Sequence, residues 1–233
     1  MRTPESTFNE IWQGKVQRET FASYVWGQNL RVDEAVRNLA GGKRFLDIGC
    51  GAGMLGKAVS GRYEEIYGID IAEDAVGLAR QNGMLASRAD LNKEALPFES
   101  SFFDSVTALS VLQYVYDAEH ALREFHRVLV PGGELLLSVP NMRSLGKLYR
   151  VFVRGRFPQT AKAYNIGSDG GAIHYFCSKD VLDLLKRVGF AICFRKGIFC
   201  RPRLMDRLPD TLGFLSTFKS EFFGGEVFVK ALR

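Results

Sequence analysis

The chain has 233 residues, of which 46% are hydrophobic, so it can bury a sizeable core within one domain. Its four cysteines contain no C-x-x-C pair and its three histidines are scattered, which argues against a disulfide framework and against a structural zinc site. The net charge of +5 hides a basic segment, residues 141–207, with 14 Lys and Arg against 4 Asp and Glu, which indicates either an anionic partner or a merely basic surface.

The N-terminal part of the chain is expected to form a helical cap, residues 1–42, in which residues 19–39 make one or two helices. This part holds no apolar run that resembles a signal peptide. No stretch of the chain reaches the roughly 18 consecutive apolar residues of a membrane span. Together with the cysteine pattern, these features lead us to expect a cytoplasmic protein.

Five short apolar runs follow the cap and alternate with helical patterns. The runs are "RFLDIG", "EIYGID", "MLASRAD", "FDSVTALS" and "GELLLSVP". Between them, the spacing of apolar residues predicts helices over residues 55–62, 73–82 and 118–129. Apolar strands joined by helices are typical of a parallel sheet that is covered on both faces, so the predicted fold class is α/β.

The C-terminal part continues with helices and ends in strands. Periodicity predicts helices over residues 144–154 and 178–188, and strands over residues 190–199 and 226–232. No low-complexity linker divides the chain, so we expect a single domain over residues 1–233. Residues 141–180 are expected to be a lid or substrate segment within that domain.

The stretch "FLDIGCGAGMLG" opens the first helix after the first strand, where an open parallel sheet binds its ligands. Its glycines allow a tight turn and a close approach of the backbone to a ligand. Asp70 ends the second strand and can accept hydrogen bonds from a ribose, which NAD and S-adenosylmethionine (SAM) both contain. Asp47 distinguishes them, because a carboxylate facing the turn disfavours a pyrophosphate and suits a ligand with an ammonium and a sulfonium group.

Two further motifs support a SAM site. Asp90 ends the third predicted strand, where its carboxylate can accept a hydrogen bond from an adenine amino group. The run "HRVLVPGGELLLSVPN" supplies a helix, a Pro-Gly-Gly turn and a strand in succession. A dinucleotide oxidoreductase is the weaker alternative, because its glycine phasing would start two residues late and would leave Asp90 and the Pro-Gly-Gly turn without a role.

Together, "LDIGCGAG", "GID", "DLN…LPFESSFFDSV" and "RVLVPGGELLLSVPN" resemble the motifs of class I SAM-dependent methyltransferases, from about Arg44 to Phe190. The resemblance is to the group that contains ubiquinone-biosynthesis O-methyltransferases and MetW-like proteins. It implies a Rossmann-like seven-stranded sheet in the order 3-2-1-4-5-7-6 with the last strand antiparallel. It also implies contacts around the methionine part of SAM, the ribose, the adenine and, at Ser110, the methyl group. The implied cofactor residues are Asp47, Gly49, Cys50, Gly51, Gly53, Asp70, Ile71, Asp90, Leu91 and Ser110.

The methyl acceptor is expected to meet the segment after the fifth strand. The helix over residues 144–154 has one apolar face and one face with Lys147, Arg150 and Arg154. It is either a lid helix packed on the sheet or, over residues 144–156, a peripheral contact with an anionic membrane. Phe and Leu are dense from residue 199 to residue 223, which suits an apolar pocket. Nucleic acid is not favoured, because no RNA-binding appendage is recognisable.

His174 is the candidate catalytic residue, because imidazole titrates near neutral pH and a glycine-rich segment precedes it. A purely structural histidine is the alternative. No metal is required, because the sulfonium of SAM is already activated. The sequence thus predicts a SAM-dependent methyltransferase that acts on a small hydrophobic acceptor, which could also be anionic, most simply at oxygen. A MetW-like regulatory partner of a metabolic enzyme is the alternative from another functional class.

Overall fold

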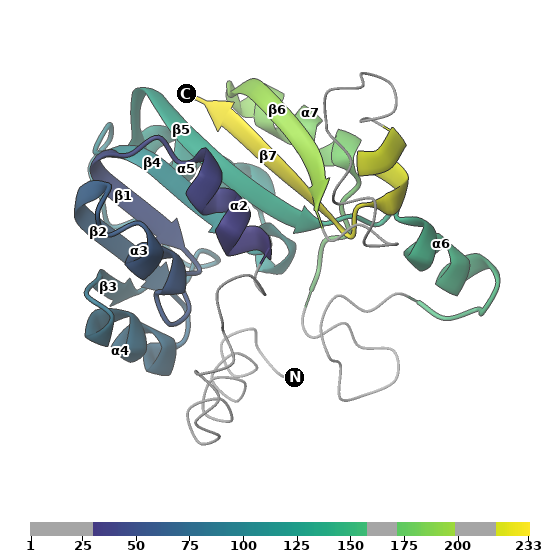
Figure 1. Cartoon of the computed structure of the whole chain (residues 1–233), viewed down its shortest axis with the longest axis horizontal. Coiled ribbons are helices and arrows are strands. Elements are labelled where there is room, and N and C mark those ends of the chain that lie inside the picture. The colour runs from purple at the N-terminus through teal and green to yellow at the C-terminus, as the bar shows by residue number, and fades with distance from the viewer. Residues whose placement is uncertain (1–29, 158–171, 199–217) are drawn as a thin grey trace.

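A computed structural model describes residues 30–157, 172–198 and 218–233. They form one seven-stranded sheet in the order β3-β2-β1-β4-β5-β7-β6 (Figure 1). Strands β1 to β5 are parallel to one another, whereas β7 is antiparallel to both β5 and β6. The predicted fold class and strand order are therefore confirmed. The strands are β1 (Gly42–Ile48), β2 (Tyr63–Asp70), β3 (Leu85–Arg88), β4 (Phe103–Leu109), β5 (Leu129–Pro140), β6 (Ala191–Ile198) and β7 (Glu226–Leu232).

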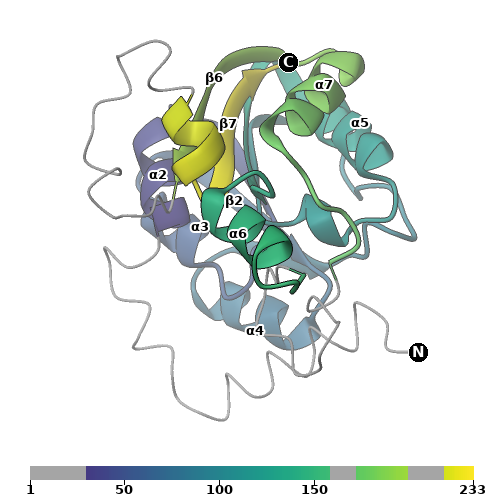
Figure 2. The same cartoon turned by 90° about the vertical axis from the view of Figure 1, so that its right-hand side faces the viewer.

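Helices cover both faces of the sheet, as Figure 2 shows with α2 and α3 on one side and α5 and α7 on the other. The described α-helices are α2 (Leu30–Asn38), α3 (Met54–Ala58), α4 (Glu73–Gln81), α5 (Ala118–Val128), α6 (Leu145–Phe152) and α7 (Ser178–Val188). None of the helices in the described ranges is long and apolar enough to cross a membrane.

Alternation along the strands divides the core into two clusters, one on each face. In β5, Leu135 and Leu137 join the cluster that contains α5 and α7, whereas Leu136 joins the cluster that contains α2, α3 and α4. Successive side chains of a strand point to opposite faces, so a continuous apolar run serves both layers. This explains why Leu135, Leu136 and Leu137 of β5 are apolar in succession.

Helix α2 is fixed to the sheet by charged groups as well as by apolar packing. Nζ of Lys196 lies 2.6 Å from a carboxylate oxygen of the buried Glu34, and Nζ of Lys230 donates to the carbonyl of Asn38 at 2.8 Å. Lys230 also pairs with the buried Glu134 at 2.6 Å. A buried carboxylate needs such partners to offset its desolvation. The predicted N-terminal cap is described only from Leu30, and its earlier part lies outside the described residues.

Several predicted boundaries shift in the structure. Helix α3 begins at Met54, after Gly53 in a left-handed conformation, and ends at Ala58 instead of continuing to residue 62. The Pro-Gly-Gly turn lies within β5, because the backbones of Gly132 and Gly133 pair with Arg233 at the end of the chain.

The expectation of a lid helix packed on the sheet is wrong for α6. None of its residues is buried, and it projects from the body beside the short π-helix η4 (Lys219–Phe223) (Figures 1 and 2). The other described part of the 141–180 segment runs from residue 172 into α7.

Candidate functional site

The glycine turn after β1 requires glycine at each of its three positions. Gly49, Gly51 and Gly53 have φ angles of 70°, 53° and 78°, which L side chains rarely adopt. A Cβ atom on Gly49 would lie 2.6 Å from Val111, and one on Gly53 would lie 2.7 Å from the sulfur of Met84. The turn is therefore a backbone cradle at the carboxyl end of β1, the position where a parallel sheet binds ligands.

Asp70 connects this turn to the end of β2. Its carboxylate accepts hydrogen bonds from the amide of Gly51 at 2.9 Å and from the amide of Ala72 at 3.0 Å. The side chain is half-buried, and a carboxylate has about four acceptor positions, so it can also accept from ribose hydroxyl groups. Asp70 thus shapes the cradle as well as facing the ligand position.

Asp47 is a buried carboxylate at the end of β1, with 5% of its surface exposed. Its oxygen accepts a hydrogen bond from the hydroxyl of Thr107 at 2.6 Å. Burial raises the pKa of Asp47 from 3.8 to about 7, with the hydrogen bond from Thr107 opposing this and the charge of Asp70 adding to it. A ligand cation would stabilise the ionised form, so the cradle fits a cofactor that carries positive charge near the turn.

Asp90 lies beside the end of β2, since the amide of Ala89 donates to the carbonyl of Asp70 at 3.0 Å. The Asp90 carboxylate is buried and accepts from the amide of Asn92 at 3.0 Å and from Lys93 at 3.1 Å. Leu91 is half-buried and packs against the core. These positions form the third side of the candidate cofactor site.

Ser110 ends β4 in a left-handed conformation, with a φ of 58°. Its amide donates to the carbonyl of Ser138 at 2.9 Å, and its hydroxyl donates to Glu226 at 3.3 Å. A residue other than glycine keeps this conformation only when its surroundings impose it, which is typical of functional sites. The strained residue lies between β1 and β5 at the carboxyl edge, as the cofactor role requires.

The two remaining sequence-predicted cofactor residues contribute differently from the others. The Cys50 thiol is buried in the core beneath the turn, where burial raises its pKa, so this side chain does not face the ligand position. Its amide donates to the carbonyl of Ile69 at 3.0 Å. Ile71 is half-buried, and its carbonyl accepts from Arg88 at 3.2 Å. The sequence pattern did not reveal that the Cys50 side chain points into the core.

Arg31 and Glu226 are candidate site residues that the sequence pattern did not reveal. Nε of Arg31 lies 2.7 Å and 2.6 Å from the two carboxylate oxygens of Glu226, and one of these oxygens also accepts from Ser110. Glu226 is buried, whereas 36% of the Arg31 side chain is exposed. The pair joins the start of α2 to the start of β7 across 195 positions of sequence. The sequence signal is a glutamate that opens the mostly apolar final strand.

His174 lies on a different side of this edge. Its Nε2 is 3.2 Å from the carbonyl of Tyr116, and its ring lines a pocket of about 490 Å³ between α5 and α7. None of the lining residues is among the expected cofactor residues. The amide of His174 donates to the carbonyl of Gln113 at 3.2 Å, which connects its segment to the end of β4. The arrangement leaves the catalytic role of His174 as a prediction.

Comparisons with known proteins find related sequences and structures. Residues 46–137 match the methyltransferase domain family. The ubiquinone biosynthesis O-methyltransferase of Pseudomonas aeruginosa is 35% identical over 115 residues, which cover 47% of this chain and 50% of that protein. The corresponding protein of Alkalilimnicola ehrlichii is 32% identical over 129 residues, which cover 52% of each chain. This chain therefore spans about half the length of the curated relatives it matches.

Solved structures share the whole architecture. A SAM-dependent methyltransferase from Mesorhizobium loti superposes with a TM-score of 0.64 at 24% identity, over 88% of this chain and 99% of that one. A putative methyltransferase of Haloferax volcanii, solved in complex with the Trm112 methyltransferase activator, also gives a TM-score of 0.64, at 15% identity over 100% of this chain and 98% of that one. At these identities, the likeness concerns the fold.

Proposed function

We propose that this chain is an enzyme that transfers the methyl group of SAM to an oxygen atom of a small apolar molecule. The match of residues 46–137 to the methyltransferase domain family and the likeness to relatives named O-methyltransferases support the proposal. The observation that carries the proposal is the buried carboxylate of Asp47 beside a glycine cradle. Among the described residues, its hydrogen-bond partner is the hydroxyl of Thr107 and not a lysine. Such a site suits a cationic cofactor and disfavours a pyrophosphate.

The chain supplies a partner for each polar part of the cofactor. Asp70 would accept from the ribose hydroxyl groups and Asp90 from the adenine amino group. Asp47 would stabilise the positive charge of the methionine part. Arg31, held in place by the buried Glu226, would bind the methionine carboxylate, because an anchored and partly exposed guanidinium is suited to a carboxylate. When bound, SAM supplies a methyl group that its sulfonium already activates.

The remaining work of the protein is to hold an acceptor oxygen in line and to receive its proton. His174 is the proposed proton acceptor. Its Nε2 faces the carbonyl of Tyr116, which fits a donor at that position and leaves Nδ1 to receive a proton. Reaction at oxygen is supported by the relatives that are named O-methyltransferases.

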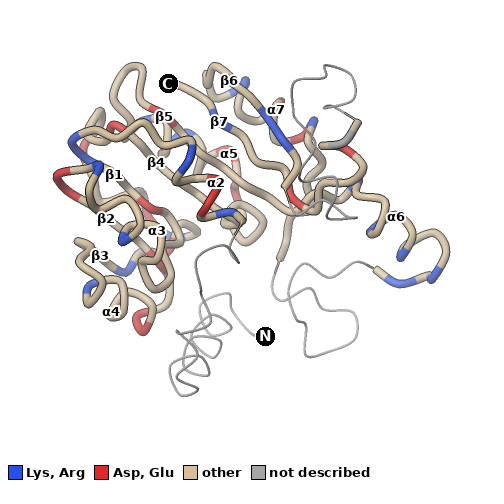
Figure 3. Tube along the Cα trace, in the orientation of Figure 1, with Lys and Arg blue, Asp and Glu red and all other residues tan. Residues whose placement is uncertain are grey.

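We also propose that α6 and the residues that follow it, residues 144–156, contact an anionic membrane surface. Residues 141–157 contain five Lys and Arg and no Asp or Glu. Phe152, at the outer end of α6, is 81% exposed, and Tyr149 is also exposed. Figure 3 shows basic residues along α6 and the residues that come after it. Exposed apolar side chains among cations are typical of helices that lie on anionic lipid.

The proposed activity is tested with labelled SAM and pools of small hydroxylated compounds, with mass detection of methylated products. Product formation that requires Asp70 would support the enzyme. A chain that binds SAM, forms no product with any pool and copurifies with a metabolic enzyme would instead support the regulatory alternative. Failure to bind SAM would contradict both.

A further inference from the structure

Two buried side-chain atoms have no hydrogen-bond partner among the residues that the structure describes, Oγ of Ser138 in β5 and Oε1 of Gln113. Gln113 lies in the short helix η2 (Leu112–Tyr114) that follows β4. Gln113 is 2% exposed. A buried acceptor without a donor is unfavourable, so such an atom in a native fold calls for a ligand or a water molecule that satisfies it.

The orientation of this carboxamide is fixed by its other end. Nε2 of Gln113 donates to the carbonyl of Ser110 at 2.8 Å. The opposite orientation would place two acceptor oxygens against each other, so Oε1 is assigned to the side without a partner. The unsatisfied group can therefore only accept a hydrogen bond.

Gln113 lies between the end of β4 and the segment that leads into α7. Gln113 donates a hydrogen bond to Ser110, and the backbone of Ser110, directly after β4, has the left-handed conformation described above. The main-chain carbonyl of Gln113 accepts from the amides of Ile173 at 2.8 Å and His174 at 3.2 Å. These two bonds hold Ile173 and His174 against η2.

We propose that Oε1 of Gln113 accepts a hydrogen bond from a hydroxyl group of the methyl acceptor, so that Gln113 selects acceptors that carry a hydroxyl. The inference rests on the proposed function, because it assumes that Ser110 borders the transferred methyl group. A site built around an acceptor oxygen discriminates strongly against analogues that lack the donor, since the buried oxygen then stays unsatisfied. The proposal includes an opening of the contact between residues 173–174 and η2, which admits the hydroxyl to this buried oxygen.

The test compares 4-fluorophenol with 4-fluoroanisole, which has a methyl group in place of the hydroxyl proton. Binding to the full chain saturated with S-adenosylhomocysteine (SAH) is followed by fluorine NMR. We expect the phenol to bind at least about tenfold more tightly than the anisole. In Gln113→Met, which keeps the length of the side chain, the preference should disappear while SAH affinity is retained. Gln81→Met, on the exposed end of α4, is the control and should keep the preference.

Equal affinities for the two probes in the unmodified chain, or no binding of either, would overturn the proposal, and so would a preference that survives in Gln113→Met. If that variant does not fold, the comparison of the two probes on the unmodified chain still decides. Failure of SAH itself to bind would count against the proposed function and is measured separately in the same samples.

Discussion

At the scale of single residues, the site contains groups whose placement is unfavourable for folding alone. Asp47 is a carboxylate without a cationic partner among the contacts described for it, and its pKa is raised to about 7 mainly by burial. Ser110 has a left-handed backbone, and Gln113 has an unsatisfied oxygen. These groups lie close together, where a polar and cationic ligand would interact with them. We therefore interpret their unfavourable contribution to the stability of the fold as a requirement of ligand binding.

The raised pKa of Asp47 gives a pH-dependent prediction for stability. The folded chain holds the Asp47 proton more tightly than the unfolded chain, so this group lowers the free energy of unfolding as the pH rises from about 4 to about 7. Asp47→Asn removes the titration and keeps an oxygen for Thr107. We expect the variant to be more stable than the unmodified chain by roughly 4 kcal/mol at pH 8 and about equally stable at pH 4, as measured by urea denaturation. A constant difference across this range would contradict the assignment.

The same residue makes SAM affinity depend on pH. Below pH 7, Asp47 must lose its proton before it can pair with the cofactor's positive charge, so affinity should rise between pH 5 and 7 by up to about tenfold per pH unit. Asp47→Asn should bind more weakly at pH 7 and show a flat profile in calorimetry. The stabilising substitution is thus expected to impair binding.

Arg31 is predicted to bind the carboxylate of SAM. Arg31→Met should lower SAM affinity roughly tenfold to a hundredfold, because a charge-assisted hydrogen bond contributes about 1.5–3 kcal/mol. Decarboxylated SAM provides the matched control, and its affinity should not change in the variant. Since Arg31→Met also leaves Glu226 buried without its partner, the double variant with Glu226→Gln should recover stability but not affinity. Recovery of both would mean that Arg31 acts only through folding.

His174 is predicted to accept the proton of the methyl acceptor. Once an acceptor is known, His174→Ala should lower the turnover rate by about 10²- to 10⁴-fold, while SAM affinity and melting temperature are retained. His120→Ala, on the exposed surface of α5, is the control. Turnover within a few-fold of the unmodified chain would assign His174 a structural role.

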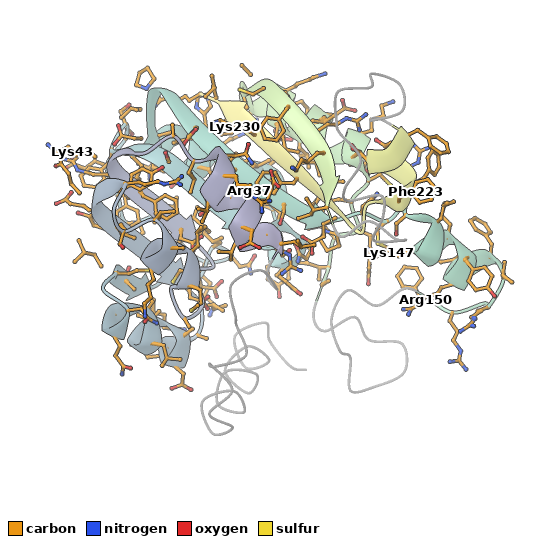
Figure 4. The ribbon with its side chains drawn as sticks, in the orientation of Figure 1. Arg37, Lys43, Lys147, Arg150, Phe223 and Lys230 are labelled. Carbon is orange, nitrogen blue, oxygen red and sulfur yellow. The ribbon has the colours of Figure 1, made fainter. Side chains whose placement is uncertain are left out.

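At the scale of elements, α6 differs from the other described helices because it has no buried residue. Its charges are also not equivalent. Lys147 donates to the carbonyl of Asn141 at 3.0 Å, so it fastens the helix to the end of β5 instead of meeting a membrane as the sequence suggested. Figure 4 places Lys147 near the body of the protein and Arg150 farther out. The proposed membrane contact therefore depends on Arg150, Arg154 and Arg156.

The prediction for α6 is that it carries binding to anionic vesicles. Arg150→Glu with Arg154→Glu should abolish sedimentation with phosphatidylglycerol vesicles, because each basic residue near an anionic surface contributes about 1 kcal/mol. The attraction of the unmodified chain should also weaken with salt. Lys43→Glu, at the opposite end of the molecule in Figure 4, is the control for charge alone. Equal binding to phosphatidylcholine vesicles, or none to either, would remove the membrane proposal.

At the scale of the whole molecule, the carboxyl edge of the sheet collects residues from most of the described chain. Hydrogen bonds follow this edge from Asp90 through Asn92 to the carbonyl of Tyr114, and Asn92 also accepts from the amide of Tyr116 at 2.6 Å. Farther along, Ser110 connects to Glu226 and so to α2. A ligand that bridges these segments should stabilise the fold as a unit.

Ligand-dependent melting tests this at the level of the molecule. SAH at about 100 times its dissociation constant adds about 2.7 kcal/mol to the free energy of unfolding, which should raise the melting temperature by roughly 5–10 °C in a chain of this length. NAD should give no shift, because its pyrophosphate would face the carboxylates of Asp47 and Asp70. Adenosine controls for the shared ribose and adenine. A shift with NAD equal to that with SAH would contradict the assigned cofactor.

The sequence by itself determined the α/β class, the approximate strands and the positions of the glycine turn and of Asp47, Asp70 and Asp90. These features depend on short-range properties. Apolar runs and glycine spacing fix local backbone structure, and the carboxyl ends of neighbouring parallel strands meet at one edge, so residues that end strands share a site. The order of the strands came from the family resemblance and was confirmed by the structure.

Only the tertiary structure decided which of these groups are buried and which distant residues join them. The direction of Cys50, the raised pKa of Asp47 and the unsatisfied oxygen of Gln113 depend on what covers each group, which no local pattern specifies. The pairing of Arg31 with Glu226 needs β7 to enter the sheet antiparallel between β5 and β6, so that its first residue arrives at the edge where β4 ends. Such contacts arise from packing between elements far apart in the sequence, so they cannot be predicted from the spacing of residues along the chain.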